Sequence, residues 1–520
     1  MCALWTKILI LAMAQVDADI VISGGTIHAG DGKPGFAGDI AIKGDRIVAV
    51  GTFKAAGNPR IIDARGMVVA PGFIDLHTHS DYPLQKTPTN GNQNYLAQGV
   101  TTVVTGNCGS GPVDTAAFLA SLAKVKTGSN VAHQVPHNDV RRQVMGNVNR
   151  APTEAELRRM EDLTDKAMRD GAWGLSTGLI YNPGTYSKTP ELSALAKVAS
   201  RHGGFYASHI RDEGAGVLAA VEEAITIGKE AKLPVHVSHI KVTGRAQWGK
   251  AGDVAERIAS ARKAGQKVTA DQYPYTASST SLTATVIPTR FREGERADMV
   301  RRFADPVSGP QLREAISQAL GRRDAGADIR IARHAPKPAW SGKTIKEIAE
   351  QSGRTPVEVV EEIERNGGAQ IINFGMNDDD MRLFMRLDFV ATASDGGSMV
   401  PDKTTSPHPR SYGTFARKVG FYSIKEGVIP LEQAIRSCSG LPADIIGFTD
   451  RGYLKAGQFA DIVVLDPGMF IDTATYDKPH QHAQGAVAVL VNGVEAVRGG
   501  KATGQLAGRP LVHQPGRAAD

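Results

Sequence analysis

The stretch PGFIDLHTHSD at residues 71–81 places two histidines at the end of an apolar run. Side chains of an extended strand alternate between its two faces, so His77 and His79 project from the same face. Two imidazoles on one face of a strand end match the spacing of metal ligands, although an isolated pair of this kind is more commonly held by hydrogen bonds. The surrounding chain decides between these two interpretations.

From about residue 71 to 426, short β-rich runs alternate with helical stretches, the pattern of a parallel sheet built from βα units. We therefore expect an α/β fold with a (β/α)8 TIM-like barrel over residues 71–426. This span is about 100 residues longer than a typical barrel, and the surplus falls in a charged, helical insertion near the barrel mouth, about 287–343. Nine runs compete for the eight strand positions: 73–77, 101–105, 131–135, 172–176, 205–208, 235–238, 267–270, 371–374 and 389–393.

Both ends of the chain are rich in short β runs, over residues 18–70 and 427–508. We expect these two segments to form one small β-sandwich, in which Asn492-Gly493 supplies a hairpin turn. Residues 509–520 form a tail, and residues 1–17 are an N-terminal extension. The extension carries one lysine, a short apolar run and an Ala-Met-Ala sequence, which together outline a weak signal peptide. We expect a cytoplasmic protein, with export through this weak signal as the alternative.

The composition excludes several classes of protein. Hydrophobic residues make up 41% and charged residues 22% of the 520 residues, which is typical of a globular protein. No apolar run approaches the roughly 18 residues that cross a bilayer, so we expect no membrane partner. The net charge of +6 is dispersed, with no dense basic stretch, so we expect no nucleic-acid partner either. Three cysteines are too few for a disulfide framework, and the oligomeric state stays open.

Other residues that can bind a metal also follow predicted strands: Cys108, His209, His239 and Asp395. In a barrel, all strand ends of one polarity meet at a single mouth, so these distant residues are expected to converge with the two histidines of residues 71–81. A set of thiolate, imidazole and carboxylate ligands suits zinc, whereas magnesium or calcium prefers oxygen ligands alone. In isolation, Cys108 would be interpreted as a small buried residue and Asp395 as part of a turn before Gly396-Gly397.

Eight motifs show that the chain resembles the D-aminoacylase (N-acyl-D-amino-acid deacylase) family of the amidohydrolase superfamily, from about residue 19 to 508. Gly-Asn-Cys-Gly and the motifs that follow it distinguish this branch from the wider superfamily. The motifs are PGFIDLHTHSD (71–81), GVTTVVTGNCG (99–109), GAWGLSTGLIYNPG (171–184), YASHIRDEG (206–214), VSHIKVTG (237–244), DQYPYTASST (271–280), ASDGG (393–397) and HPRSYGTF (408–415).

This resemblance implies one tightly held Zn²⁺ on Cys108, His209 and His239. It also implies a second, weaker position framed by His77 and His79 with help from Asp395, although the sequence leaves open whether one or two zinc ions bind. Tyr181, Lys241, Tyr273 and, less directly, Ser279 are implied to hold the carboxylate of the substrate. The residues agree with part of this assignment, because Lys241 follows His239 by two positions and shares its face if the strand continues. Arg211 is a further candidate anion binder, or else an ion-pair partner of the adjacent Asp212 and Glu213.

The predicted function is zinc-dependent hydrolysis of N-acyl-D-amino acids, small molecules that yield a carboxylate and a free D-amino acid. A zinc-activated water is the expected nucleophile, and Asp395 is the expected general base and acid. The alternatives are cleavage of dipeptides with a C-terminal D-residue, opening of a cyclic amide, and a metal-binding protein without catalytic activity on the same fold. Met399, in a short loop without arginine, favours an apolar D-side chain, which an arginine elsewhere, such as Arg410, would overturn.

Overall fold

The computed structural model describes residues 15–514, so the signal-like segment expected at the N-terminus lies outside the described residues except for Gln15. Eight parallel strands form the barrel: β8 (Phe73–Asp75), β9 (Val100–Thr105), β10 (Asn130–His133), β12 (Gly174–Gly178), β13 (Phe205–His209), β14 (Val235–Val237), β15 (Val268–Gln272) and β19 (Val390–Thr392). The short strand β11 (Val135–Pro136) continues β10 and pairs with β12. A parallel bridge between Thr78 and Gly396 joins the first strand to the last and closes the ring.

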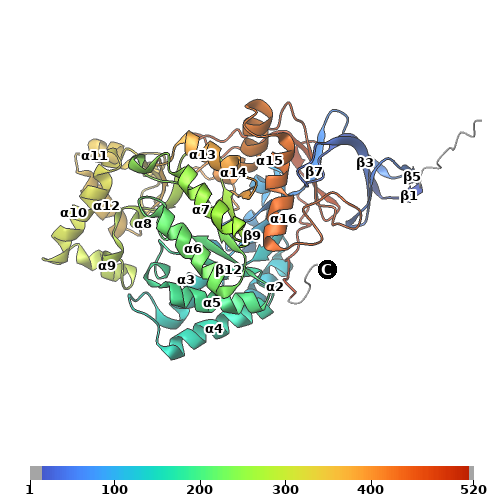
Figure 1. Cartoon of the computed structure of the whole chain (residues 1–520). Helices are drawn as coiled ribbons and strands as arrows, with labels where there is room; N and C mark the ends of the chain where they lie inside the picture. Colours follow the sequence, from blue (N-terminus) through green and yellow to red (C-terminus); the bar gives the residue numbers. More distant parts are fainter. Residues whose placement is uncertain (1–14, 515–520) are drawn as a thin grey trace, which may run out of the picture.

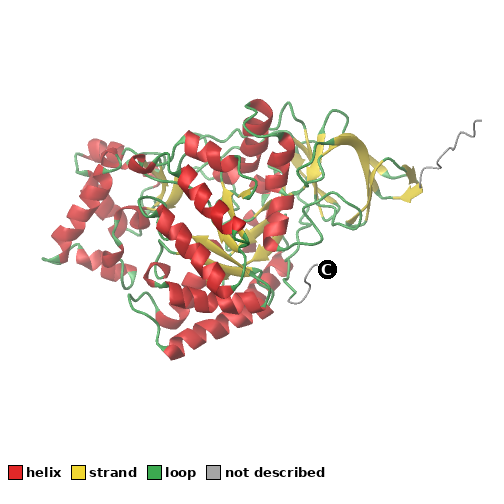
Figure 2. Ribbon diagram, viewed as in Figure 1, coloured by secondary structure: helices red, strands yellow, loops and turns green. Residues whose placement is uncertain are grey.

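Helices surround this barrel (Figures 1 and 2). Successive outer helices pack against one another in the order α4 (Glu154–Arg169), α5 (Thr189–Arg201), α6 (Val217–Ala231) and α7 (Ala251–Lys263). Helix α4 begins with a capping box, in which Thr153 and Glu156 satisfy each other's backbone N–H groups. The apolar faces of these helices bury the outer side of the strands in one continuous core. No helix within residues 15–514 has the length and apolar character needed to cross a membrane.

The ninth candidate strand, 371–374, lies outside the barrel. It corresponds to β18 (Gln370–Asn373), which pairs antiparallel with β16 (Ser278–Ser281) and β17 (Ile329–Arg333). A short apolar run has the same sequence pattern in either kind of sheet, so its pairing was not readable from the sequence.

The three-stranded sheet belongs to the insertion, which occupies residues 278–373 and has a core of its own. The expected boundaries, about 287–343, lie inside this segment. Figure 1 shows the insertion as the yellow-green lobe at one end of the molecule. Its helices are α8 (Leu282–Val286), α9 (Arg296–Arg302), α10 (Ser308–Gly321), α11 (Ile345–Ser352) and α12 (Pro356–Arg365).

The β domain combines both ends of the chain in one curved sheet, at the far end of the molecule from the insertion (Figure 1). Its central contact pairs β7 (Val68–Pro71) with β20 (Ile462–Leu465). Alternate residues of β20 face two cores, with Ile462 and Val464 inside the domain and Val463 and Leu465 against the barrel. The remaining strands of this sheet are β2 (Ile20–Ile27), β3 (Phe36–Lys43), β4 (Arg46–Gly51), β6 (Arg60–Asp63), β21 (Ala486–Val491), β22 (Val494–Arg498) and β23 (Lys501–Ala502).

The boundary expected at residues 426/427 falls before two further barrel helices. Helices α15 (Leu431–Cys438) and α16 (Gly440–Ile446) pack on β8 and β19, so the barrel continues to residue 446. Their sequences carry ordinary helical periodicity, which does not reveal the sheet on which a helix packs.

Candidate metal centre

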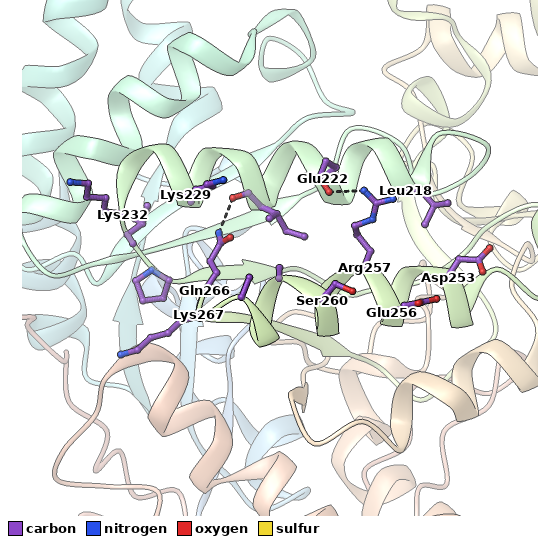
Figure 3. A pocket seen from close by; sticks show the side chains of 17 residues that line it. Leu218, Glu222, Lys229, Lys232, Asp253, Glu256, Arg257, Ser260, Gln266 and Lys267 are labelled. Atoms are coloured by element: carbon purple, nitrogen blue, oxygen red, sulfur yellow. Dashed lines mark hydrogen bonds and ion pairs between the residues drawn. The ribbon is translucent and has the colours of Figure 1, made fainter.

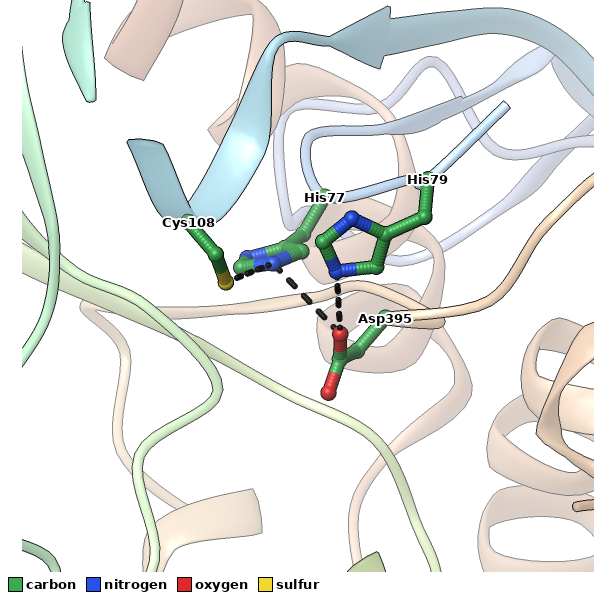
Figure 4. Close-up of side chains that lie close together, drawn as sticks. All are labelled: His77, His79, Cys108 and Asp395. Carbon is green, nitrogen blue, oxygen red and sulfur yellow. Dashed lines mark hydrogen bonds and ion pairs between the residues drawn. The ribbon is translucent and has the colours of Figure 1, made fainter. Parts of the chain in front are cut away.

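Six side chains from five strand ends form two overlapping groups at the barrel mouth. In the first group, Cys108 Sγ lies 3.4 Å from His209 Nδ1 and 3.6 Å from His239 Nε2. In the second, the same sulfur lies 3.2 Å from His77 Nε2, which is 3.5 Å from Asp395 Oδ1. Figure 4 shows how His79 completes the second group, with Nε2 3.0 Å from the same carboxylate oxygen. The structure therefore brings together all six residues that the sequence placed at a metal site.

The backbone at the strand ends turns sharply to aim these side chains. Cys108, His239 and Asp395 all have left-handed φ angles, of 52°, 36° and 50°. Such angles are uncommon outside glycine and concentrate at functional sites. Around the cysteine, a Cβ atom on Gly106 or Gly109 would come within 2.2 Å of the Gln134 carbonyl or the Asn138 side chain. The two glycines of the Gly-Asn-Cys-Gly sequence are therefore required by the turn that presents the sulfur.

The first group fits a tetrahedral zinc ion. Zn–S and Zn–N bonds of typical length place sulfur and nitrogen ligands about 3.6 Å apart, close to the distances around Cys108. Burial lowers the pKa values of His77, to about 4, and of His209, so that both are neutral and can offer a lone pair to a metal. Burial also raises the pKa of the Cys108 thiol, which a bound cation would reverse. The chemistry of the donor set thus fits the metal that the sequence implied.

Asp395 forms a buried ion pair with Arg410, with 2.7 Å between Oδ2 and Nη1. Burial disfavours the charged carboxylate, but Arg410 and the neighbouring histidines outweigh burial and hold the pKa of Asp395 well below its usual range. Arg410 is the first residue of α14 (Arg410–Ala416), and its Nη2 also donates to the carbonyl oxygen of Ser279 at 3.1 Å. Asp395 is consequently ionised and can accept a proton.

Glu213 lies behind the first group and contacts its histidines from the side opposite the sulfur. Its Oε1 lies 3.1 Å from His239 Nδ1, 3.8 Å from His209 Nε2 and 2.5 Å from Lys241 Nζ. Arg211 pairs with Glu223 at 2.9 Å, rather than with the adjacent Asp212 or Glu213. The sequence signal for Glu213 is its position four residues after His209, but the sequence is equally consistent with a local ion pair between Glu213 and Arg211.

A second buried carboxylate, Asp271 at the end of β15, contacts His77 and His239. Its Oδ1 accepts the backbone N–H of His239 at 2.6 Å, and its Oδ2 lies 3.5 Å from His77 Nδ1. The same oxygen lies 2.7 Å from His236 Nε2. Carboxylates in this position orient metal-binding histidines. Asp271 belongs to a motif of the family resemblance, yet its role was not predicted, since its partner His236 resembles an ordinary core residue in the sequence.

A cavity of about 700 Å³ opens onto the metal centre, and the insertion supplies part of its wall. Tyr181 and Ser279 line this cavity, and the Tyr181 hydroxyl is 2.8 Å from Thr280 Oγ1. Lys241 and Tyr273 are buried behind the lining, where the Tyr273 hydroxyl has no hydrogen-bond partner among the described residues. Lys241 is paired with Glu213, and its role in holding the substrate carboxylate stays a prediction.

A larger groove, of about 1190 Å³, runs between α6 and α7 on the outside of the barrel (Figure 3). Its lining mixes acidic and basic side chains, and an ion pair between Arg257 and Glu222, 2.8 Å long, crosses it. Histidine and cysteine are absent from this described lining, in contrast to the cavity at the barrel mouth. The groove therefore offers no comparable chemistry.

The fold and this group of candidate metal-binding side chains are those of a metal-dependent hydrolase of the amidohydrolase type, and comparisons with known proteins specify the family. Residues 60–497 match the Amidohydrolase family, and the chain belongs to it. D-aminoacylase of Alcaligenes xylosoxydans xylosoxydans is 36% identical, over 96% of this chain and 99% of the relative. N-acyl-D-glutamate deacylase of the same organism is 35% identical, over 97% and 96%. The structure of N-acyl-D-glutamate deacylase from Bordetella bronchiseptica, complexed with zinc and a phosphonate inhibitor, matches with a TM-score of 0.82 at 33% identity, over 96% of this chain and 100% of that one.

Proposed function

We propose that this protein is an N-acyl-D-amino-acid deacylase that hydrolyses a linear amide with the help of zinc. The observation that carries the proposal is the joint convergence of Cys108, His209 and His239 beside the ionised carboxylate of Asp395. The full-length similarity to D-aminoacylase and N-acyl-D-glutamate deacylase supports the same reaction.

Cys108, His209 and His239 would hold the tightly bound zinc, and His77, His79 and Asp395 would share Cys108 with a second, weaker metal position. When bound, zinc supplies a Lewis acid for the amide carbonyl and lowers the pKa of an attacking water. Asp395 accepts the proton of that water and returns it to the departing nitrogen, which suits a carboxylate kept charged by Arg410. Such a proton shuttle contributes about 10² to 10⁴-fold to the rate.

The cavity wall next to the metal centre is suited to hold the carboxylate of the substrate. Arg410 and Tyr181 face this cavity, and Ser279 lies beside them on the insertion. Lys241 and Tyr273 reinforce this wall from behind, where Arg410 lies 5.0 Å and Lys241 5.5 Å from the centre of the tyrosine ring. Met399 lines the same cavity, but Arg333 and Arg410 line it too, so the apolar D-side chain expected from Met399 loses its support, and we propose no preference between apolar side chains and the acidic ones named for two relatives.

The test is a panel of N-acetylated D- and L-amino acids assayed with added zinc by release of free amine. We expect turnover of N-acetyl-D-amino acids, with the L-enantiomers at least tenfold slower. Comparing N-acetyl-D-leucine with N-acetyl-D-glutamate shows whether Met399 or the arginines of the cavity wall govern the side-chain preference. Dipeptides with a C-terminal D-residue belong in the same panel, because they present an equivalent amide. Absence of turnover for every N-acetyl-D-amino acid, with zinc bound, would refute the proposed function.

A further inference from the structure

The side of His239 that faces away from Cys108 holds two competing partners. Lys241 Nζ lies 2.7 Å from His239 Nδ1, and Glu213 Oε1 lies 3.1 Å from the same nitrogen. Lysine as an ammonium can only donate a hydrogen bond, whereas a carboxylate can only accept one. The two partners therefore favour opposite protonation states of the same imidazole nitrogen.

Each arrangement has a definite consequence for the metal centre. If Lys241 donates to Nδ1, the proton of the neutral ring sits on Nε2, the atom 3.6 Å from Cys108 Sγ, and that atom loses its lone pair. If Nδ1 carries the proton and donates to Glu213, Nε2 is free to bind a metal. Only the second tautomer can bind a metal through Nε2.

Glu213 also contacts the ammonium itself, with 2.5 Å between Oε1 and Nζ. We propose that Glu213 selects the metal-binding tautomer of His239, both by accepting its Nδ1–H and by directing the Lys241 ammonium to itself. Glu213 is thus a positioning residue, which acts on the reaction through the shape of the metal centre. The inference rests on the proposed function only in that Cys108, His209 and His239 hold zinc.

The test measures zinc affinity of the full-length protein, by competition with a chromophoric chelator after removal and return of the metal. Glu213→Met keeps the length of the side chain but removes both its charge and its hydrogen-bond acceptors, which leaves Lys241 to donate to Nδ1. Loss of a carboxylate behind a metal-binding histidine typically weakens metal affinity about 10- to 100-fold, and we expect a loss of this size. Glu223→Met is the matched control, because it removes a carboxylate on α6 that pairs with Arg211, and it should leave zinc affinity unchanged.

The decisive variant is the double change Glu213→Met with Lys241→Met. Neither methionine can donate to Nδ1, so we expect zinc affinity to recover at least tenfold relative to Glu213→Met alone. The zinc affinity of Lys241→Met alone should stay within about threefold of the wild type. This change is smaller than the loss of about 10-fold or more that follows removal of a residue supporting a metal ligand. The visible absorption spectrum of the cobalt-substituted protein reports the geometry of the metal ligands. It should therefore change in the single Glu213 variant and return toward that of the wild type in the double variant.

Two results would overturn the inference: wild-type zinc affinity in Glu213→Met, or a double variant that binds zinc no better than Glu213→Met. If the methionine variant does not fold, Glu213→Asp takes its place, since its shorter carboxylate withdraws from Nδ1 and its zinc affinity should be restored by Lys241→Met in the same way. If the variants rank in zinc affinity as expected but the wild type hydrolyses no N-acyl-D-amino acid, the proposed function is refuted and this inference stands.

Discussion

Replacing Arg410 with Met should change how the reaction depends on pH. In the wild type, the ion pair with Arg410 holds the pKa of Asp395 well below its usual range, so the basic form persists into acid solution. Without the guanidinium, burial raises the pKa of Asp395. The carboxylate of Asp395 is then protonated at a higher pH, so the acid limb of the pH–rate profile shifts to higher pH.

The size of this effect follows from the geometry of the pair. Two unit charges about 4 Å apart attract by about 4 kcal/mol at the effective dielectric constant of about 20 that suits protein sites. His77, His79 and a bound metal still stabilise the carboxylate, so part of this energy remains. We expect the acid limb to rise by about 1 to 2 pH units, at 1.36 kcal/mol for each unit.

The assay is the pH dependence of kcat and kcat/KM for N-acetyl-D-leucine. Measuring both constants separates the titration of Asp395 from weaker binding of the substrate carboxylate, which raises KM. Arg417→Met is the matched control, because it breaks a partly buried ion pair, to Asp472 at 3.0 Å, away from the metal centre. Coincident acid limbs for Arg410→Met and the wild type would show that Arg410 does not set the charge of Asp395.

Two further variants test the residues at the metal centre. Asp395→Ala should retain the tightly bound zinc while kcat falls by about 10² to 10⁴-fold, the usual contribution of a general base; activity near the wild-type level would remove Asp395 from that role. Cys108→Ala should lower the zinc content measured by elemental analysis of the purified protein, because three of the contacts in the two groups involve its sulfur. Unchanged zinc would mean that Cys108 is not a ligand.

The convergence of the six candidate metal-binding residues could be predicted because strand alternation and barrel geometry together fix where strand ends meet. Their assignment to a metal came from the family resemblance, since a pair such as His77 and His79 is by itself more commonly held by hydrogen bonds, and it stays a prediction. The choice of barrel strands was less certain, since the run that became β18 has the same pattern as a barrel strand.

The supporting residues were harder to predict because their positions depend on tertiary packing. Arg410 reaches Asp395 only because α14 begins next to the metal centre, which no local pattern reveals. Glu213 lies in the loop after β13, beside Arg211 and Asp212, where a charged residue is expected on the surface. Its inward direction results from Lys241 and His239, two side chains from the next strand end.

The pairing of β7 with β20 has a consequence for how the protein is made. The two strands are separated by about 390 residues, and β20 leaves the ribosome roughly 20 to 80 s after β7 at ordinary rates of translation. During that interval the nascent N-terminal strands present an unpaired edge, the kind of surface that invites aggregation. Cellular holdases that shield such edges should therefore increase the yield of folded protein more than they would for a barrel whose outer domain is encoded as one continuous segment.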